Sequence, residues 1–145
     1  MLSKMESSFD IMHLIYCSRA TNFENKEEFE RNLHDIFSQS QTYNSLHEIT
    51  GALMTDGEMF AQVIEGPMAA VSAMYSKIVN DQRHENIIEL QRALVHVRLF
   101  NFWPLVLLRK KNISHVRTLD SQSTLNDFRK TSVYILKSLR PVILR

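Results

Sequence analysis

Residues 49–67 read ITGALMTDGEMFAQVIEGP, two apolar runs on either side of Asp56–Gly57. An Asp–Gly dipeptide tolerates the positive φ angles of a tight hairpin turn, so the runs predict antiparallel strands near 49–55 and 59–65. Gly66 can end the second strand, and Pro67 suits the first turn of a helix. The stretch therefore predicts a β-hairpin that leads directly into a helix.

The segment before the hairpin predicts one strand and one helix. Residues 11–17, IMHLIYC, are rich in β-branched and aromatic residues, and a period of two places Leu14 and Tyr16 on the same face. Asn25 is a typical helix N-cap, with Glu28 three residues later. Apolar residues then recur with helical spacing, so we expect this helix to run to about Tyr43.

The segment after the hairpin completes one domain. Apolar residues at helical spacing predict a second helix that stops near 81–84, and residues 87–97 and 103–108 predict two further strands. The resulting order, β-α-β-β-α-β-β, resembles the split βαβ, ferredoxin-like plan. We therefore expect an α+β fold with a mixed, largely antiparallel sheet and two helices on one face.

A C-terminal extension follows the predicted sheet. After Lys110 the composition turns polar, and Ser123 can cap a helix that Pro141 would stop. The apolar residues expected to form one stripe of this helix are Leu125, Phe128, Ile135 and Leu139. We expect residues 111–145 to form a helical extension that covers the free face of the sheet or makes an oligomer contact.

Composition excludes several classes of protein. The chain has 145 residues, the size of one ordinary domain, and a net charge of +1, so no strong field attracts nucleic acid or anionic lipid. Residues 1–10 lack a signal peptide, and the longest apolar run, 103–108, is too short to cross a bilayer, which favours the cytoplasm. One cysteine and the absence of HExxH or paired CxxC spacing give no indication of a metal site.

Polar residues occur where the predicted core should be apolar. Gln62 shares a strand face with Phe60 and Ile64, and Tyr16 shares one with Leu14, so an amide and a phenol can meet on adjacent strands. Taken alone, each could be an ordinary core polar residue with a satisfied hydrogen bond. A glutamine carries donors and an acceptor, however, so it can bridge a phenol to a heterocycle and reverse that pattern by rotating or tautomerising.

Together with their neighbours, these residues make the stretch 11–110 resemble the BLUF family, which are sensors of blue light using FAD. The chain resembles the short, single-domain members of that family. The resemblance rests on several motifs in one order: LIYCS at 14–18, YN at 43–44, ITGAL at 49–53, FAQVIEG at 60–66, DQRH at 81–84 and RLFNFW at 98–103. The family binds FAD noncovalently between the two helices, with the flavin ring over the sheet. The glycines show no GxGxxG spacing, which agrees with a flavin site that is not of Rossmann type.

The resemblance also implies roles for individual residues. Tyr16 would be the electron and proton donor to the excited flavin, Gln62 the hydrogen-bond switch, and Asn44 the partner of the flavin imide edge. Further residues at cofactor-lining positions are Lys77, Asp81, Arg83 and His84; those that would modulate the response are Ser40, Trp103 and Leu105. From the residues alone, Lys77 and Arg83 could equally be surface cations, His84 a contact of the helix end, Ser40 a solvated hydroxyl and Trp103 a core residue.

Two residues depart from the family pattern. Many members have Met where this chain has Leu105, and many have Asn where it has Tyr43. Leucine lacks the flexible thioether of methionine, so rearrangement of the fifth strand could differ. Tyr43 removes an amide contact and could stack on the flavin instead.

These observations predict a blue-light photoreceptor with FAD as cofactor rather than an enzyme, because no acid–base or nucleophile constellation accompanies the flavin positions. Its output would be a change of binding, through a homo-oligomer or a separate signalling protein. Two alternatives share the fold plan. One is an acylphosphatase-like hydrolase with Arg19 in an anion cradle, which lacks a glycine-rich phosphate loop. The other is a non-photoactive regulatory or RNA-binding domain, which the near-neutral charge disfavours.

Overall fold

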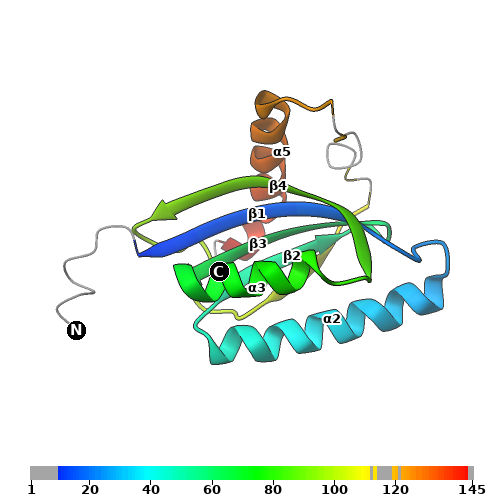
Figure 1. Cartoon of the computed structure of the whole chain (residues 1–145), viewed down its shortest axis with the longest axis horizontal. Coiled ribbons are helices and arrows are strands. Elements are labelled where there is room, and N and C mark those ends of the chain that lie inside the picture. Colours follow the sequence, from blue (N-terminus) through cyan, green and yellow to red (C-terminus); the bar gives the residue numbers. More distant parts are fainter. Residues whose placement is uncertain (1–9, 112, 114–118, 121, 144–145) are drawn as a thin grey trace.

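The computed structural model describes residues 10–111, 113, 119–120 and 122–143. Its elements follow one another in the predicted order (Figure 1). They are β1 (Ile11–Ala20), α2 (Lys26–Leu46), β2 (Thr50–Thr55), β3 (Met59–Pro67), α3 (Met68–Val79), β4 (His84–Val95), β5 (Val106–Arg109), α5 (Leu125–Ser138) and α6 (Arg140–Ile143).

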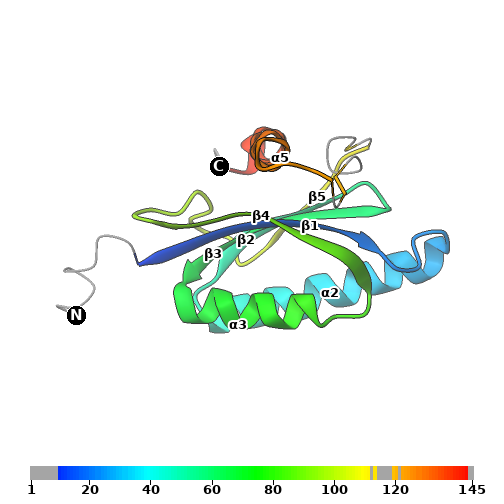
Figure 2. The same cartoon turned by 45° about the horizontal axis from the view of Figure 1, so that its top comes forward.

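The five strands form one mixed sheet in the order β4-β1-β3-β2-β5. Pairs β1–β3, β1–β4 and β2–β3 are antiparallel, whereas β2–β5 is parallel. Helices α2 and α3 lie together on one face and α5 lies on the other (Figure 2). The predicted α+β class, the largely antiparallel sheet and the placement of both helices on one face are thus confirmed.

The hairpin forms as its turn residues predict. Gly57 has a φ of 97°, and the Asp56 side chain accepts hydrogen bonds from the backbone N–H groups of Glu58 and Met59 at 3.0 and 2.9 Å. Gly51 is required for a different reason: a Cβ there would lie 2.0 Å from the carbonyl oxygen of Val63. Only glycine therefore lets β2 approach β3 this closely.

The first two helices differ from the prediction only at their ends. Asn25 caps α2 by accepting a hydrogen bond from Glu28 N at 3.1 Å, as expected, but the helix continues past Tyr43 to Leu46. Pro67 occupies the N-cap position of α3 rather than its first turn, and α3 ends at Val79.

The fifth strand is shorter than predicted. Its pairing with β2 extends only from Ala52↔Val106 to Thr55↔Arg109, so Trp103 and Leu105 precede the strand. Pro104 has no N–H to contribute to a sheet ladder, which explains why an apolar run starting at 103 does not pair from its first residue. The fourth strand, in contrast, begins at His84, three residues before the predicted 87.

The tail helix covers the second face of the sheet, as predicted, and its details need correction. Its N-cap is Thr124 rather than Ser123, with a reciprocal capping box to Asp127. Leu125 is 61% exposed and does not belong to the packed stripe, which retains Phe128, Ile135 and Leu139. Helix α5 ends before Pro141, which lies inside the short helix α6.

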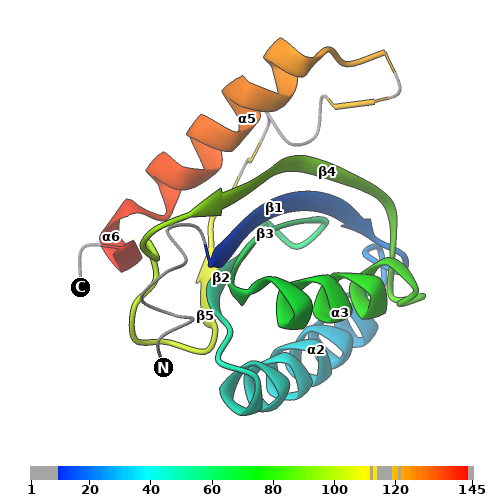
Figure 3. The same cartoon turned by 60° about the vertical axis from the view of Figure 1, so that its left-hand side comes forward.

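The core has a layer on each face of the sheet. Helix α5 lies on one face of the sheet, which we call the tail side (Figure 3). There Ile15 and Cys17 of β1 pack with Val63 of β3 and with Ile135 and Leu139. The alternate residues of β1 and β3 face α2 and α3. Leu14, Tyr16 and Ile64 form part of this helix-side core.

Ile135→Ala should destabilise the fold by about 2–5 kcal/mol, because Ile135 is fully buried and truncation leaves a cavity under α5. Val133 on the same helix is 51% exposed, so Val133→Ala should change the free energy of unfolding by about 0.5 kcal/mol or less. Chemical denaturation of both variants tests this. Equal effects would contradict the packing of α5 on the sheet.

Candidate functional site

The predicted contact between Tyr16 and Gln62 is present. The two residues are register partners on adjacent strands, β1 and β3, and the Tyr16 hydroxyl donates a hydrogen bond to Gln62 Oε1. Their side chains face α2 and α3 and are almost completely buried, with 4% and 3% exposure. A phenol and an amide thus form a polar pair inside an otherwise apolar layer.

The surroundings of Tyr16 keep its phenol protonated. Burial raises the pKa of Tyr16 well above its ordinary value, and the acidic groups of Tyr75 and Asp81 raise it further. The ring of Tyr75 lies 5.8 Å from that of Tyr16, and the His84 ring approaches edge-on at 6.1 Å. Burial also raises the pKa of Tyr75, to about 12.

Two adjoining cavities lie beside this pair, between the sheet and the helices. The inner cavity has a volume of about 40 Å³, and polar groups of Tyr16, Gln62 and His84 line it together with Leu53 and Phe60. The outer cavity has a volume of about 220 Å³. Residues lining both are Ser40, Ile78, Asp81 and Arg83; those lining only the outer cavity include Gln39, Tyr43 and Lys77.

His84 is fixed by a hydrogen bond on each side of its ring. Its Nε2 lies 2.5 Å from the carbonyl oxygen of Ile78, near the end of α3, and its Nδ1 lies 2.7 Å from Ser18 Oγ. A carbonyl only accepts, so Nε2 carries the proton and Nδ1 can accept from the serine. His84 therefore makes the helix-end contact that the sequence suggested and also lines the inner cavity.

The charged residues gather at the outer cavity. Arg83 donates to both carboxylate oxygens of Asp81 and also to Gln39 Oε1 on α2, at 3.1 Å. Burial alone would raise the pKa of Asp81, but the hydrogen bonds and charge of Arg83 outweigh it and lower that pKa. The Lys77 ammonium lies 4.1 Å from the centre of the Tyr43 ring, which places both residues in the outer cavity.

Asn44 lies apart from the residues that line the inner cavity. Its Nδ2 donates to the carbonyl oxygen of Pro104 at 2.8 Å, and its side chain is buried. Among the described residues, no group donates a hydrogen bond to its Oδ1. A buried acceptor without a donor is costly, so this oxygen is able to accept a further hydrogen bond from an N–H group.

The structure separates the two predicted modulating residues that precede β5. Leu105 is 2% exposed and packs in the same cluster as Leu53 and Phe60, two residues of the inner cavity wall. Trp103 is half exposed, so it is not the core residue that was considered. Arg19, the candidate for an anion cradle, stacks on Phe23 at 4.4 Å and lies 3.6 Å from Glu58.

The sequence analysis missed two kinds of site residue. The apolar wall of the inner cavity includes Ile36, which helical periodicity alone could not distinguish from ordinary core. Ser18 belongs to the LIYCS motif and has no predicted role of its own, yet its hydroxyl holds the His84 ring through a hydrogen bond. Its position two residues after Tyr16 on the same strand face is the signal that could have found it.

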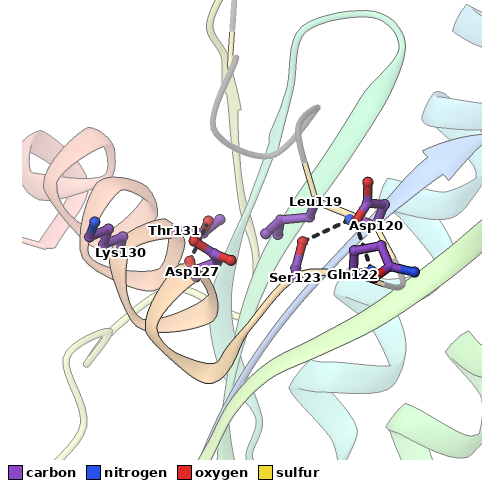
Figure 4. A pocket seen from close by; sticks show the side chains of 7 residues that line it. All are labelled: Leu119, Asp120, Gln122, Ser123, Asp127, Lys130 and Thr131. Carbon is purple, nitrogen blue, oxygen red and sulfur yellow. Dashed lines mark hydrogen bonds between the residues drawn. The ribbon is translucent and has the colours of Figure 1, made fainter.

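A separate depression of about 330 Å³ lies at the start of α5 (Figure 4). Its polar groups already bond one another: Asp127 with Thr124, and Asp120 with Ser123 and Gln122. These bonds form the cap and turn that begin the helix, so the depression offers no comparable site. Within the described ranges, no cluster of His, Cys, Asp and Glu could hold a metal ion, and no helix could span a membrane.

The raised pKa of Tyr16 gives a pH-dependent prediction. Above about pH 10 the unfolded chain loses the Tyr16 proton while the folded protein keeps it, so stability should fall by up to about 1.4 kcal/mol per pH unit. Below about pH 10 the stability contribution of the protonated Tyr16 phenol is fully present. Unfolding of wild type and Tyr16→Phe at about pH 9 and about pH 11 tests this. Wild type should lose more stability than the variant; equal losses would contradict the burial argument.

Comparison with known proteins identifies relatives of this arrangement. Residues 11–106 match the BLUF family profile, described as sensors of blue-light using FAD. The blue light- and temperature-regulated antirepressor BluF of Escherichia coli is 35% identical over 64 residues, covering 44% of this chain and 16% of that protein. Photoactivated adenylate cyclase subunit alpha of Euglena gracilis is 28% identical over 90 residues, covering 62% of this chain and 8% of that protein. The chain thus spans less than a fifth of the length of these curated relatives.

Solved structures match nearly the whole chain. The photo-activated state of BlsA has a TM-score of 0.70 at 25% identity and covers 89% of this chain and 94% of that one. The BlsA ground state has a TM-score of 0.71 at 25% identity and covers 93% and 89%. The dark state of BlrB, at 24% identity and a TM-score of 0.67, covers 90% and 100% and supports the fold.

Proposed function

Since this chain belongs to the BLUF family, the sensors of blue light using FAD, we propose that Tyr16 and Gln62 form its light-operated switch. One observation carries the proposal: the buried phenol of Tyr16 donates directly to the buried amide of Gln62, at the wall of a cavity between sheet and helices. Their pairing is explained by a function at that cavity.

The chemistry of the residues around the cavities fits FAD. A flavin imide edge offers an N–H and a carbonyl, and Asn44 has a buried Oδ1 without a donor among the described residues. The outer cavity carries Lys77 and Arg83, cations suited to the dinucleotide end. The cavities, about 40 and 220 Å³, are smaller than the roughly 300–1,000 Å³ of typical ligand sites. FAD can therefore bind only if the cavities widen. Release of the Arg83–Gln39 contact across the outer cavity would permit this widening.

FAD, when bound, supplies the absorption of blue light and an excited state that accepts an electron and a proton. Tyr16 would supply both from its phenol and would take both back in the dark, so that neither group is oxidised or reduced at the end of the cycle. Gln62 changes its hydrogen bonds in the process, because rotation or tautomerisation of the amide exchanges donor and acceptor positions. In the structure its Oε1 accepts from Tyr16, which leaves the amino group for other partners.

The remaining cavity residues hold the cofactor and its surroundings. Arg83 and Lys77 bind the phosphate-bearing part, and Asp81 orients the Arg83 guanidinium through three hydrogen bonds. His84 forms a rigid wall beside Tyr16, fixed by Ser18 and Ile78. Ser40 lies where the two cavities meet and contributes a hydroxyl to both.

The output of the switch is a change of protein binding rather than a catalytic step. Residues 11–110 form the flavin-binding unit and 111–145 the helical extension that meets a separate signalling protein or a second copy of the chain. The names of two relatives, an antirepressor and a photoactivated adenylate cyclase, support a role upstream of other activities. A cytoplasmic location stays a prediction from the sequence.

Absorption spectroscopy tests the function as a whole. The purified chain loaded with FAD should show a small red shift of the flavin absorption under blue light, and the shift should decay in the dark. Failure to bind FAD would contradict the proposal. So would irreversible bleaching without a red shift.

A further inference from the structure

A fully buried carboxylate lies outside the proposed switch. Glu65 of β3 points to the tail side and has no exposed surface. Its Oε2 lies 2.8 Å from Nδ1 of His13, its register partner on β1. Its Oε1 accepts from the backbone N–H groups of Leu99 and Phe100 at 2.8 and 2.9 Å. A buried charge is retained only where partners satisfy it, and here two of the partners belong to a loop.

That loop, residues 96–105 between β4 and β5, is called the connecting segment below. Arg98 Nη1 donates to Thr50 Oγ1 at 2.9 Å and to the Glu65 carbonyl oxygen at 3.2 Å. Further along, the Trp103 carbonyl oxygen accepts from Gly51 N at 3.3 Å. The connecting segment is therefore fastened to the hairpin β2–β3 at its middle and near its end.

The next contact of the connecting segment is with Asn44. The Pro104 carbonyl oxygen accepts from Asn44 Nδ2 at 2.8 Å. A carbonyl can only accept, so this contact fixes the amino side of the amide toward Pro104 and the oxygen side away from it. Without Pro104, rotation of the amide by half a turn would exchange donor and acceptor.

We propose that Glu65 is a positioning residue for FAD: it holds the connecting segment so that the Pro104 carbonyl orients the Asn44 amide. The inference rests on the proposed role of Asn44 at the flavin imide edge. Glu65 lines neither the inner nor the outer cavity. It satisfies two adjacent N–H groups whose burial would otherwise be costly, and the segment that carries them keeps Pro104 beside Asn44.

The test is a double-mutant cycle on the full chain, with FAD affinity measured by quenching of flavin fluorescence. Glu65→Ala removes the acceptor of Leu99 and Phe100 and should weaken FAD binding roughly tenfold. Glu65→Gln keeps an oxygen for both N–H groups and can donate to the other tautomer of His13, so it should restore binding close to wild type. In an Asn44→Ala background, Glu65→Ala should add little further loss, because its effect passes through Asn44.

A second readout separates positioning from general destabilisation. The infrared band of the flavin C4=O group reports hydrogen bonds at the imide edge, and it should shift in Glu65→Ala and Asn44→Ala but not in Glu65→Gln. If Glu65→Ala does not fold, Glu65→Asp serves instead. Its carboxylate is one methylene shorter and withdraws from the loop N–H groups, so it should give the same shift in weaker form.

Two outcomes would overturn the inference. One is that Glu65→Ala weakens FAD binding equally in the wild-type and the Asn44→Ala backgrounds, which would indicate that Glu65 has only a structural role. The other is unchanged FAD affinity and an unchanged C4=O band in Glu65→Ala. Both are distinct from failure of the proposed function, in which the wild-type chain itself would bind no FAD or show no reversible red shift.

Discussion

Tyr16→Phe should abolish the reversible red shift while FAD stays bound. The substitution removes one hydroxyl from a residue that is 4% exposed and leaves the ring in place, so the core and the cavity wall keep their shape. It also removes the donor to Gln62 Oε1 and the proton that the switch must release. Absorption spectra before and after blue light, with FAD content measured on the same sample, give the result.

Tyr75→Phe is the matched control for this variant. Tyr75 lies on α3 with its ring 5.8 Å from that of Tyr16, and it also has a raised pKa, but it does not bond Gln62. Its red shift should be normal. A normal shift in Tyr16→Phe, or loss of the shift in both variants, would refute the specific role of Tyr16.

Gln62→Leu should also abolish the red shift, because it removes the one side chain at the pair that can exchange donor and acceptor. Leucine has a similar volume and suits the apolar neighbours of Gln62, so the packing cost should be small. The variant leaves the Tyr16 hydroxyl without its acceptor. It thereby separates electron donation by Tyr16 from the hydrogen-bond change of Gln62. Tyr16 can still donate an electron, and blue light should produce transient changes that return without a shifted intermediate.

Gln82→Leu serves as the control for the loss of an amide. Gln82 is exposed in the turn before Arg83 and lines neither cavity. Its spectrum and recovery should match the wild type. Retention of a full reversible shift in Gln62→Leu would assign the switch to another residue.

Patterns of local spacing account for what could be predicted of the fold. The period of two correctly placed Tyr16 on the strand face of Leu14, and Gln62 on that of Ile64. That these faces turn toward α2 and α3 is known from the structure. Asp56–Gly57 located the hairpin because turn chemistry depends on the residues in the turn itself. Capping residues located the start of α2 for the same reason.

The region before β5 could not be predicted in this way, because its structure depends on distant partners. The apolar run predicts a strand over residues 103–108, yet the strand begins only at Val106. A four-residue parallel strand is set by its neighbour β2 rather than by its own pattern. As a result Leu105 lies in the core and Trp103 at the surface. The dependence of the output on Trp103 stays a prediction.

The setting of Asn44 was likewise invisible from local sequence. Its partner Pro104 lies 60 residues away in the sequence. Glu65, which fastens the same segment, stands out in the sequence only as part of the FAQVIEG motif. Contacts of this kind depend on the path of a loop, which no periodicity describes. The proposed role of Asn44 at the flavin imide edge is inferred from the resemblance to a family. Its hydrogen-bond partner Pro104 is known from the structure.

We expect light to change the hydrogen bonds of the Gln62 amide. Light-minus-dark infrared difference spectra of the FAD-loaded chain, prepared with and without isotope-labelled glutamine, detect such a change. Only groups that change on illumination contribute to such a spectrum. Glutamine side-chain bands should therefore move with the label and be missing from Gln62→Leu. Flavin bands that change on illumination without any label-sensitive glutamine band would contradict it.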